Sequence, residues 1–455
     1  MIPLPLDEVS RLCAGRLHRT AWADEITGVQ IDSRRIAEGD LFVAIGAGSD
    51  FVPHALARGA AAALVPEQPF ASMAALGRAV RERSAAKVVG ITGSTGKTST
   101  KDILAALCRP HTRMIAAEAS YNAELGVPLT LCRLEPGTEL CILELAMRGF
   151  GQIAELCAIA RPEVGVITAI GPVHLEFVGS IQGVARAKAE LVDALPPGGT
   201  IVVPSDAEEL DRFLERSDID VVRVGPGGDV SAGQVDLFDD HAQVEVERAG
   251  EYFSLRLAVN SYHQVSNALF ALAAYCAVGL PLVDVGRGAG EIALARWRGE
   301  ELPLPGGGTL INDAYNANPA SMRAALEHLV QRAGTSRRVA VLGDMAELGD
   351  AAPRYHREIG EIAAELGIDV IVAVGGLARG YVEEGRPIPF AVQVASASEA
   401  VGALERLLEP GDWVLVKASR AVALEAVADA LTGVRAHAPA AATLRAGHSN
   451  SESTI

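Results

Sequence analysis

The segment "TGSTGKTST", residues 92–100, combines the residue types that hold a phosphate group. It follows a short apolar run, "VVGI", and precedes a segment with helical apolar spacing. Glycines let backbone N–H groups face phosphate oxygens, and the N-terminus of the following helix favours the same anion. Lys97 would neutralise phosphate charge, and the Thr98 hydroxyl would reach Mg²⁺. We expect nucleotide contacts from seven consecutive residues: Gly93, Ser94, Thr95, Gly96, Lys97, Thr98 and Ser99.

The loop differs from the strict P-loop pattern, which needs Gly, four residues and then Gly-Lys-Ser or Gly-Lys-Thr. The first glycine would stand at position 91, but that residue is Ile91, and Gly93 is the glycine nearest to it in the loop. The alternative interpretation is a glycine-rich turn with a surface lysine. An apolar strand before the loop and a helix after it favour phosphate binding.

Three more polar residues stand in or beside apolar segments. Glu144 ends the apolar run "LCILEL", and a carboxylate at the carboxyl end of a parallel strand suits Mg²⁺. His174 follows the run "VGVITAI", and Lys188 lies in the helical segment "ARAKAEL". The alternatives are a helix cap or surface acid for Glu144, a structural histidine, and a solvated lysine.

Alternating strand and helix patterns divide the chain into three α/β domains. Residues 1–84 form a small α/β N-terminal domain. Residues 85–295 form a central parallel-sheet domain that contains the P-loop-like segment, within which residues 242–259 alternate as an antiparallel piece. Residues 296–432 form a C-terminal Rossmann-like domain with a doubly wound sheet. The composition of residues 433–455 predicts a disordered tail.

Composition limits the possible partners. A formal net charge of −17 argues against nucleic-acid binding and against an anionic membrane surface. The six cysteines show no CxxC pair, which indicates reduced core thiols. No apolar run reaches membrane-spanning length and the N-terminus has no signal-peptide pattern, so we expect a cytoplasmic protein without membrane insertion.

Several segments in a fixed order resemble the Mur ligases of peptidoglycan synthesis. The resemblance extends from "DSRRIAEGDLFVAI" (32–45) to "LVKASRA" (415–421). It is carried by "TGSTGKTSTKD", "YNAELGVPLTL", "LELAMRGFGQIAEL", "IGPVHLEFVGS", "AKAEL", "NDAYNANPASM" and "VLGDMAELG". The tripeptide-forming sister ligases typically carry His-Thr-Pro in place of "YNANP". The resemblance implies a first domain for the UDP part of the substrate, an ATPase second domain and a third domain that closes over the nucleotide.

The implied reaction joins two peptides. The γ-phosphate of ATP goes to the terminal carboxylate of a UDP-MurNAc-tripeptide, giving an acyl phosphate with a good leaving group. The amine of D-alanyl-D-alanine attacks it, which gives an amide, ADP and phosphate. Whether the third residue of the tripeptide is diaminopimelate or lysine stays open. The implied partners are these two substrates, and we expect a monomer.

The resemblance also implies roles for individual residues. Lys97, Lys188 and His174 would be catalytic. Two Mg²⁺ ions would be held by Thr98, Glu144, His174 and a carbamylated Lys188. Nucleotide contacts would come from Asn267, Arg298, Asp313 and Asn316, with Arg296 as a competitor of Arg298. Substrate contacts would come from Ser33, Arg34, Asn122, Asn318 and Asp344.

This chain departs from the family pattern at two places. Relatives usually carry Gly two positions before the residue that matches His263, where this chain has Ser261-Tyr262. Relatives often read Lys-Gly-Ser-Arg near the end, where this chain has Ala418 in "KASR". The first departure weakens a role for His263, and the second weakens any close backbone approach at Ala418.

Two other functions compete with this one. A folylpolyglutamate-type ligase shares the ATPase core, but "YNANP" and "GDMAELG" argue against it. A non-catalytic nucleotide-binding regulator is the other alternative. Such a regulator need not keep the whole metal set, which argues against it here.

Overall fold

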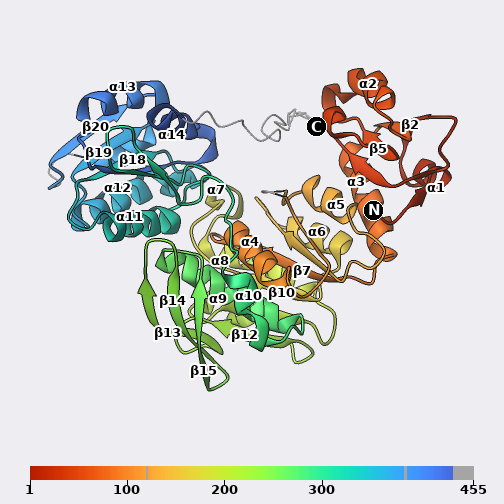
Figure 1. Ribbon diagram of the computed structural model, residues 1–455, viewed down its shortest axis with the longest axis horizontal. Coiled ribbons are helices and arrows are strands. Elements are labelled where there is room, and N and C mark those ends of the chain that lie inside the picture. Colours follow the sequence, from red (N-terminus) through yellow and green to blue (C-terminus); the bar gives the residue numbers. More distant parts are fainter. Residues whose placement is uncertain (119–120, 384–386, 434–455) are drawn as a thin grey trace, which may run out of the picture. The chain divides into compact units, whose positions relative to one another are not determined.

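The computed structural model describes residues 1–118, 121–383 and 387–433 (Figure 1). The chain has mixed α/β structure, as the sequence predicts. All but the first residue of the predicted tail, 433–455, lies outside the described residues. No described helix is long and apolar enough to cross a membrane.

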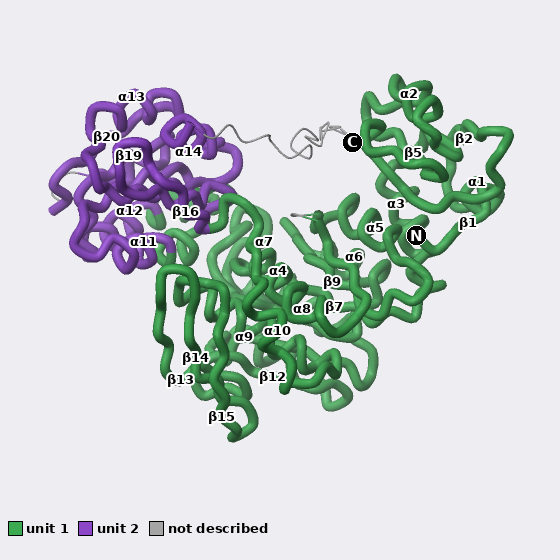
Figure 2. Tube along the Cα trace, viewed as in Figure 1, with its two compact units in different colours: residues 1–298, 318–324, 345–355 green, residues 299–317, 325–344, 356–455 purple. Residues whose placement is uncertain are grey.

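Contacts between Cα atoms divide the chain into two compact units, coloured green and purple in Figure 2. The first unit comprises Met1–Arg298, Asn318–Ala324 and Met345–Tyr355. The second comprises Gly299–Ala317, Ala325–Asp344 and the described residues from His356 onward. Two short segments beyond Arg298 therefore belong to the first unit. The boundaries at 84 and 295 stay predictions.

The N-terminal part of the first unit holds a four-stranded sheet of order β2-β6-β5-β4. These strands are β2 (Gly15–Arg19), β4 (Gly28–Gln30), β5 (Asp40–Val43) and β6 (Ala62–Pro66). The short strands β1 (Leu4–Pro5) and β3 (Glu25–Ile26) pair separately. Helices α1 (Leu6–Leu12), α2 (Val52–Ala57) and α3 (Pro69–Glu82) complete this part.

A nine-stranded sheet of order β15-β14-β13-β12-β11-β10-β7-β9-β8 forms the centre of the first unit. Its parallel strands are β7 (Lys87–Thr92), β8 (Met114–Ala116), β9 (Leu140–Glu144), β10 (Val164–Ile167), β11 (Thr200–Pro204), β12 (Asp220–Val224) and β13 (Val230–Leu237). The strands β14 (Ala242–Arg248) and β15 (Glu251–Leu257) add an antiparallel edge, which confirms the prediction for residues 242–259.

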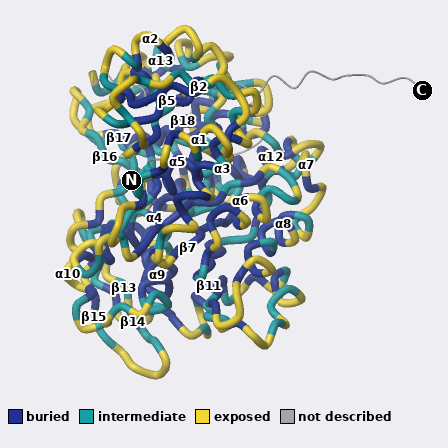
Figure 3. The backbone as a smooth tube through the Cα atoms, turned by 90° about the vertical axis from the view of Figure 1, so that its right-hand side faces the viewer, coloured by how far each residue is buried: buried dark blue, intermediate teal, exposed yellow. Residues whose placement is uncertain are grey.

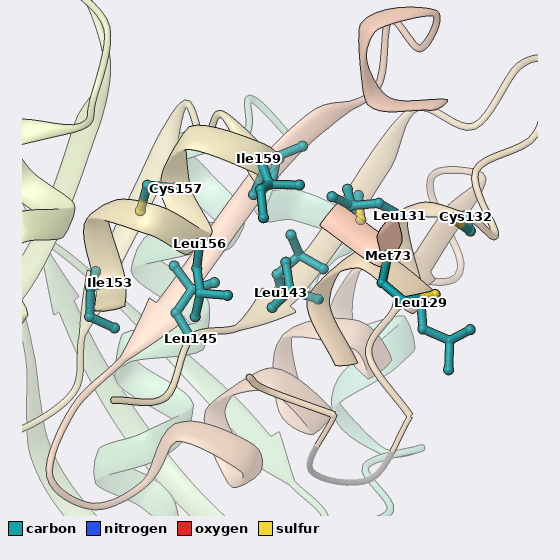
Figure 4. Close-up of a cluster of buried hydrophobic side chains, with 14 of the residues drawn as sticks. Met73, Leu129, Leu131, Cys132, Leu143, Leu145, Ile153, Leu156, Cys157 and Ile159 are labelled. Atoms are coloured by element: carbon teal, nitrogen blue, oxygen red, sulfur yellow. The ribbon is translucent and has the colours of Figure 1, made fainter. Parts of the chain in front are cut away.

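Central strands of this sheet are apolar on both faces because helices cover both faces. All five residues of β9 are buried. Cys141 and Leu143 face one core, which includes α3, α5 (Gly126–Leu131), α6 (Gln152–Ala160) and α8 (Ile181–Asp193). Leu140 and Ile142 face the other, which includes α4 (Lys97–Cys108) and α9 (Tyr262–Ala277). Figure 3 shows helix α4 and the strand β7, which neighbours β9, largely in the dark blue of buried residues. Figure 4 shows Leu143 and Leu145 among the side chains of α6. β7 and β9 pair in parallel, so their carboxyl ends lie at the same edge of the sheet.

The second unit is built on a six-stranded sheet of order β16-β17-β21-β18-β19-β20. Its strands are β16 (Glu300–Pro303), β17 (Thr309–Asn312), β18 (Arg338–Gly343), β19 (Val370–Val374), β20 (Phe390–Val394) and β21 (Trp413–Lys417). All pairs are parallel except β16 with β17. The associated helices are α11 (Pro319–Ala333), α12 (Ala352–Glu365), α13 (Ala397–Leu407) and α14 (Glu425–Thr432). This sheet matches the doubly wound domain predicted from the sequence.

Candidate nucleotide and metal site

The loop between β7 and α4 needs glycine at two positions. Gly93 has φ +148° and Gly96 has φ +80°, which other residues rarely adopt. A Cβ at Gly93 would collide with the Thr168 hydroxyl, and a Cβ at Gly96 would collide with the Asn267 amide oxygen. The loop therefore lies against the end of β10 and against α9. Asn267 is beside the loop, as a nucleotide contact requires.

Lys97 and Thr98 begin α4 and face the end of β9. The Lys97 ammonium donates to the Gly93 carbonyl at 2.8 Å. The Thr98 hydroxyl donates to Glu144 Oε2 at 2.7 Å, and Asn122 Nδ2 donates to Glu144 Oε1 at 2.8 Å. Arg298 Nη2 donates to Thr98 Oγ1 at 2.7 Å. The structure thus brings together six residues that the sequence analysis named: Gly93, Lys97, Thr98, Asn122, Glu144 and Arg298.

The charges in this cluster influence one another. Burial lowers the pKa of Lys97, and the nearby Arg298 charge lowers it further, while the Glu144 charge opposes both. Glu144 is 1% exposed, so its carboxylate lies at a buried strand end beside a hydroxyl. Oxygen donors of this kind fit Mg²⁺, which usually takes only one or two protein carboxylates beside phosphate oxygens. The interpretation of Glu144 as a surface acid is wrong.

His174 lies in a left-handed backbone conformation with φ 54° and pairs with Glu347, which has φ 61°. The His174 Nδ1 atom is 2.5 Å from Glu347 Oε2, and Arg148 Nε is 3.2 Å from Glu347 Oε1. Burial lowers the pKa of His174, and the Glu347 hydrogen bond acts in the opposite direction. Two unusual backbone conformations at one contact are typical of functional sites.

Lys188 points into the protein from α8. The side chain is 1% exposed, so the interpretation as a solvated lysine is wrong. Burial, with the charge of Lys97, lowers the pKa of Lys188 well below its usual value. Within the described residues, its ammonium makes no hydrogen bond or ion pair. The described part of the chain also contains no group of three or more His, Cys, Asp or Glu side chains placed to hold a metal ion.

The remaining loop residues hold the loop in place. Ser94 Oγ accepts from Gly171 N at 3.0 Å, and Asn318 Nδ2 lies 3.4 Å from the Ser94 carbonyl. Thr168 Oγ1 donates to the Thr95 carbonyl at 2.5 Å. Ser99 is buried within α4. Asn318 belongs to the first unit, so the segment "NPASM" contributes to the surroundings of the loop.

In the second unit, Asp313 and Asn316 share one partner. Lys417 Nζ is 2.6 Å from Asp313 Oδ2 and 2.9 Å from the Asn316 carbonyl. Asp344 Oδ1 accepts from Ala378 N at 2.6 Å, at the start of a 3₁₀ turn. This contact gives Asp344 a structural role that the sequence did not predict.

In the first domain, the described contacts of Ser33 and Arg34 are local. Ser33 Oγ lies 3.1 Å from His54 Nδ1. Arg34 pairs with the neighbouring Asp32 at 2.7 Å and is largely exposed. The structure therefore leaves the Arg34 side chain at the surface, as a contact for an anionic group requires.

Sequence reasoning missed Glu347 and Lys417. Glu347 lies in the quoted segment "VLGDMAELG", from which the sequence analysis named only Asp344 as a site residue. Its contact joins residues 173 positions apart, and no local spacing signals it. Lys417 stands in the quoted "KASR" and is 2% exposed. A lysine that ends an apolar strand was the available signal.

Comparison with known proteins agrees with this geometry. Residues 91–275 match the family model of the Mur ligase middle domain, and residues 297–420 match that of the Mur ligase, glutamate ligase domain. The UDP-N-acetylmuramoyl-tripeptide–D-alanyl-D-alanine ligase of Mycobacterium tuberculosis is 36% identical over 95% of this chain and 98% of its own length.

Two solved structures are also similar over most of the chain. A crystal structure of MurF from Acinetobacter baumannii has a TM-score of 0.84 at 28% identity, covering 95% of this chain and 99% of that one. The MurF ligase of Thermotoga maritima, in complex with ADP, has a TM-score of 0.77 at 27% identity and covers 89% of this chain and 97% of that one. The likeness therefore covers the fold as well as the phosphate loop.

Proposed function

The chain belongs to the Mur ligase family, and we propose that it joins D-alanyl-D-alanine to UDP-N-acetylmuramoyl-tripeptide in an ATP-dependent ligation that serves peptidoglycan synthesis. The full-length similarity to ligases of this name is the observation that carries the proposal. The site is consistent with it, because a phosphate loop and a buried carboxylate meet at one sheet edge.

In this reaction the protein acts mainly by positioning and by neutralising charge. The loop N–H groups and Lys97 would hold the ATP phosphates. Arg298, which donates to the Thr98 hydroxyl, would contact the transferring phosphoryl group. The tripeptide carboxylate attacks the γ-phosphorus, and ADP leaves. The amine of the dipeptide then attacks the acyl carbon, and phosphate leaves as the amide forms.

Magnesium would be held by Glu144 and the Thr98 hydroxyl. When bound, it would supply positive charge at the phosphate oxygens. Asn122 orients the Glu144 carboxylate through its second oxygen. This assignment rests on the donor set, which is made of oxygens at a buried strand end.

A second magnesium ion would require Lys188 to be carbamylated. An ammonium repels a cation, whereas a neutral amine can react with carbon dioxide. In that reaction the nitrogen forms a bond to carbon and loses a proton, which leaves an anionic carbamate. The burial of Lys188 and its lowered pKa favour the neutral amine. The carbamate and His174 would then hold the second ion.

We also propose contacts for the remaining candidate residues. Asn267 would contact adenine, and Asp313 and Asn316 would contact the ribose side of the nucleotide. Ser33 and Arg34 would contact the UDP part of the substrate. Asn318 would contact substrate on the nucleotide side, and Asp344 would contact the dipeptide. We also propose a monomeric enzyme that acts in the cytoplasm, where ATP is available.

Phosphate release from ATP tests the function. We expect rapid release only when UDP-MurNAc-tripeptide and D-alanyl-D-alanine are both present, with the pentapeptide product seen by mass spectrometry. Parallel assays with the diaminopimelate and lysine tripeptides identify the preferred third residue. Turnover that instead depends on a folate and glutamate would support the sister ligase. ATP binding without turnover under every condition would support a regulator.

A further inference from the structure

A segment that begins in α10 (Gly286–Ala289) runs along helix α4 toward the phosphate loop. We call residues 288–298 the linker segment. Gly288 lies against the C-terminal half of α4, since a Cβ there would collide with the Ala106 carbonyl. Ala295 N donates to Asp102 Oδ2 at 3.0 Å, and Arg298 Nη2 donates to Thr98 Oγ1 at 2.7 Å. The three contacts proceed along α4 from its C-terminal half to its first turn.

Two of these contacts fix the end of the linker segment. Thr98 and Asp102 stand four residues apart and so share one face of α4. Between their partners, Trp297 is 4% exposed and has φ 63°. A bulky residue adopts such a conformation only when its surroundings hold it there. The path of the backbone into Arg298 is therefore imposed by contacts with the first unit.

The Asp102 carboxylate is itself held in orientation. Its Oδ1 atom is 3.0 Å from Lys101 Nζ, and this ammonium donates to the Ala117 carbonyl at 2.8 Å. Lys101 is 2% exposed, so the pair lies inside the protein. Burial raises the pKa of Asp102, while Lys101 and the Ala295 N–H act in the opposite direction. The proposed reaction makes no use of either residue.

We propose that Asp102 is a positioning residue that sets the Arg298 guanidinium at the Thr98 hydroxyl by holding the Ala295 N–H. Asp102 touches no substrate and acts only through the linker segment. The inference rests on the proposed function, because Arg298 matters there as a contact of the transferring phosphoryl group. Through its contact with the linker segment, Asp102 would affect the rate of phosphoryl transfer.

The competing role for Asp102 is purely structural, as the charge partner of Lys101. The two roles differ in what a neutral substitute can do. Asp102→Asn keeps an oxygen for the Ala295 N–H but loses the negative charge. A positioning role therefore survives this substitution largely intact, whereas a charge-partner role does not.

A double-mutant cycle with Arg298 provides the test. The proteins compared are wild type, Asp102→Asn, Asp102→Ala, Arg298→Ala and the Asp102→Ala/Arg298→Ala double variant. We expect Arg298→Ala to lower kcat about 100-fold, as the loss of a charged donor at a transition state does. Asp102→Ala should lower kcat about tenfold, with a smaller effect on the KM for ATP, because a misplaced group acts on the chemical step.

Non-additivity is the decisive result. In the Arg298→Ala background, Asp102→Ala should lower kcat by less than about twofold. Asp102→Asn should stay within about threefold of wild type, because a neutral acceptor keeps most of the hydrogen bond. Glu139→Ala serves as a matched control, since that carboxylate accepts from Arg113 N at 2.9 Å in the turn after α4. We expect its kcat to be unchanged.

Three outcomes would overturn the inference: multiplicative effects in the double variant, an Asp102→Asn protein as impaired as Asp102→Ala, or an Arg298→Ala protein with normal kcat. In each of these cases, the proposed function is still supported if the wild-type enzyme makes the pentapeptide. Wild-type protein without ligation would instead reject the proposed function. Thermal unfolding of each variant identifies loss of folding. If Asp102→Ala does not fold, the kcat of Asp102→Asn distinguishes the two roles, because only the charge-partner role predicts a large loss there.

Discussion

Lys97 is the cation of the phosphate loop, and its ammonium contacts the Gly93 carbonyl beneath that loop. We expect Lys97→Ala to lower ATP turnover by at least about 1,000-fold, because it removes positive charge from the transferring phosphate. The fold should persist, since the side chain is only partly buried. Initial rates of phosphate release measure the first effect and circular dichroism the second. Near-normal turnover would reject the proposed role of the loop.

Lys188 should carry a carbamate in the active enzyme. Lys188→Ala should be inactive, and added acetate or formate should restore part of the activity by supplying the missing carboxylate. Protein equilibrated with ¹³C-labelled carbon dioxide should show a carbamate signal in the ¹³C spectrum that Lys188→Ala lacks. If neither rescue nor the signal is seen, Lys188 acts as a plain ammonium.

The lowered pKa of Lys188 also predicts how stability depends on pH. In carbon-dioxide-free buffer, the unfolded chain binds a proton at Lys188 up to about its usual pKa of 10.5, whereas the folded chain loses it at a lower pH. Between these two values the unfolded state binds more protons, so stability rises with pH. Lys188→Met should therefore be the more stable protein at neutral pH, and its advantage should shrink toward pH 10.5. Urea unfolding of both proteins across this range measures the difference.

Residue types were easier to predict than their partners. The loop, Glu144 and Lys188 stand in or beside apolar runs, so the local sequence was enough to predict where they lie. The local sequence could not predict the partner of His174, because Glu347 is 173 residues away along the chain. It could not predict the contact of Asp102 with Ala295 either, because these residues are 193 positions apart.

At the scale of elements, α10 can pack against α4 only because Gly288 has no side chain. A Cβ at Gly288 would lie 2.6 Å from the Leu107 Cα, so backbone would have to move. We expect Gly288→Ala to lower the free energy of unfolding by about 1–3 kcal/mol, as overpacking does. Gly290→Ala is the matched control, because a Cβ there meets nothing within 4 Å. Urea denaturation of the two variants tests this, and equal stabilities would contradict it.

Elements with long apolar runs were predicted well, and short or exposed ones were not. The strands β7, β9 and β10 are buried and apolar, and they coincide with the runs "VVGI", "LCILEL" and "VGVITAI" in the sequence. β16 and β20 could not be identified in the same way. Neither contains a buried residue, so neither carries the pattern that identifies a strand.

At the scale of the whole molecule, the two units have separate hydrophobic cores. Those of the first unit lie on the two faces of the nine-stranded sheet, and that of the second unit lies at the six-stranded sheet. We expect two calorimetric transitions. A non-hydrolysable ATP analogue with Mg²⁺ should raise the transition temperature of the first unit. At a concentration 100 times its Kd, the analogue should add about 2.7 kcal/mol to the free energy of unfolding of that unit. Lys97→Ala should abolish most of this shift, and an equal shift in that variant would count against the loop as the binding site.

The three-domain α/β class followed from the order of strand and helix patterns. The division of the chain between units did not, because it depends on contacts that form only in the folded protein. The segments 318–324 and 345–355 belong to the first unit although they follow its main part along the chain. They contain Asn318 and Glu347, which contact the phosphate loop and His174.

This discontinuity limits how the gene could be divided. A polypeptide that stops after Arg298 would lack segments 318–324 and 345–355. The complementary fragment would contain these two segments but not the rest of the first unit, against which they pack. Fragment complementation should therefore fail for a break at that position. Circular permutation is the more promising route, provided that new termini are opened in a turn that leaves residues 288–355 unbroken. Chimaeras of related ligases should likewise take the whole of residues 288–355 from one parent protein.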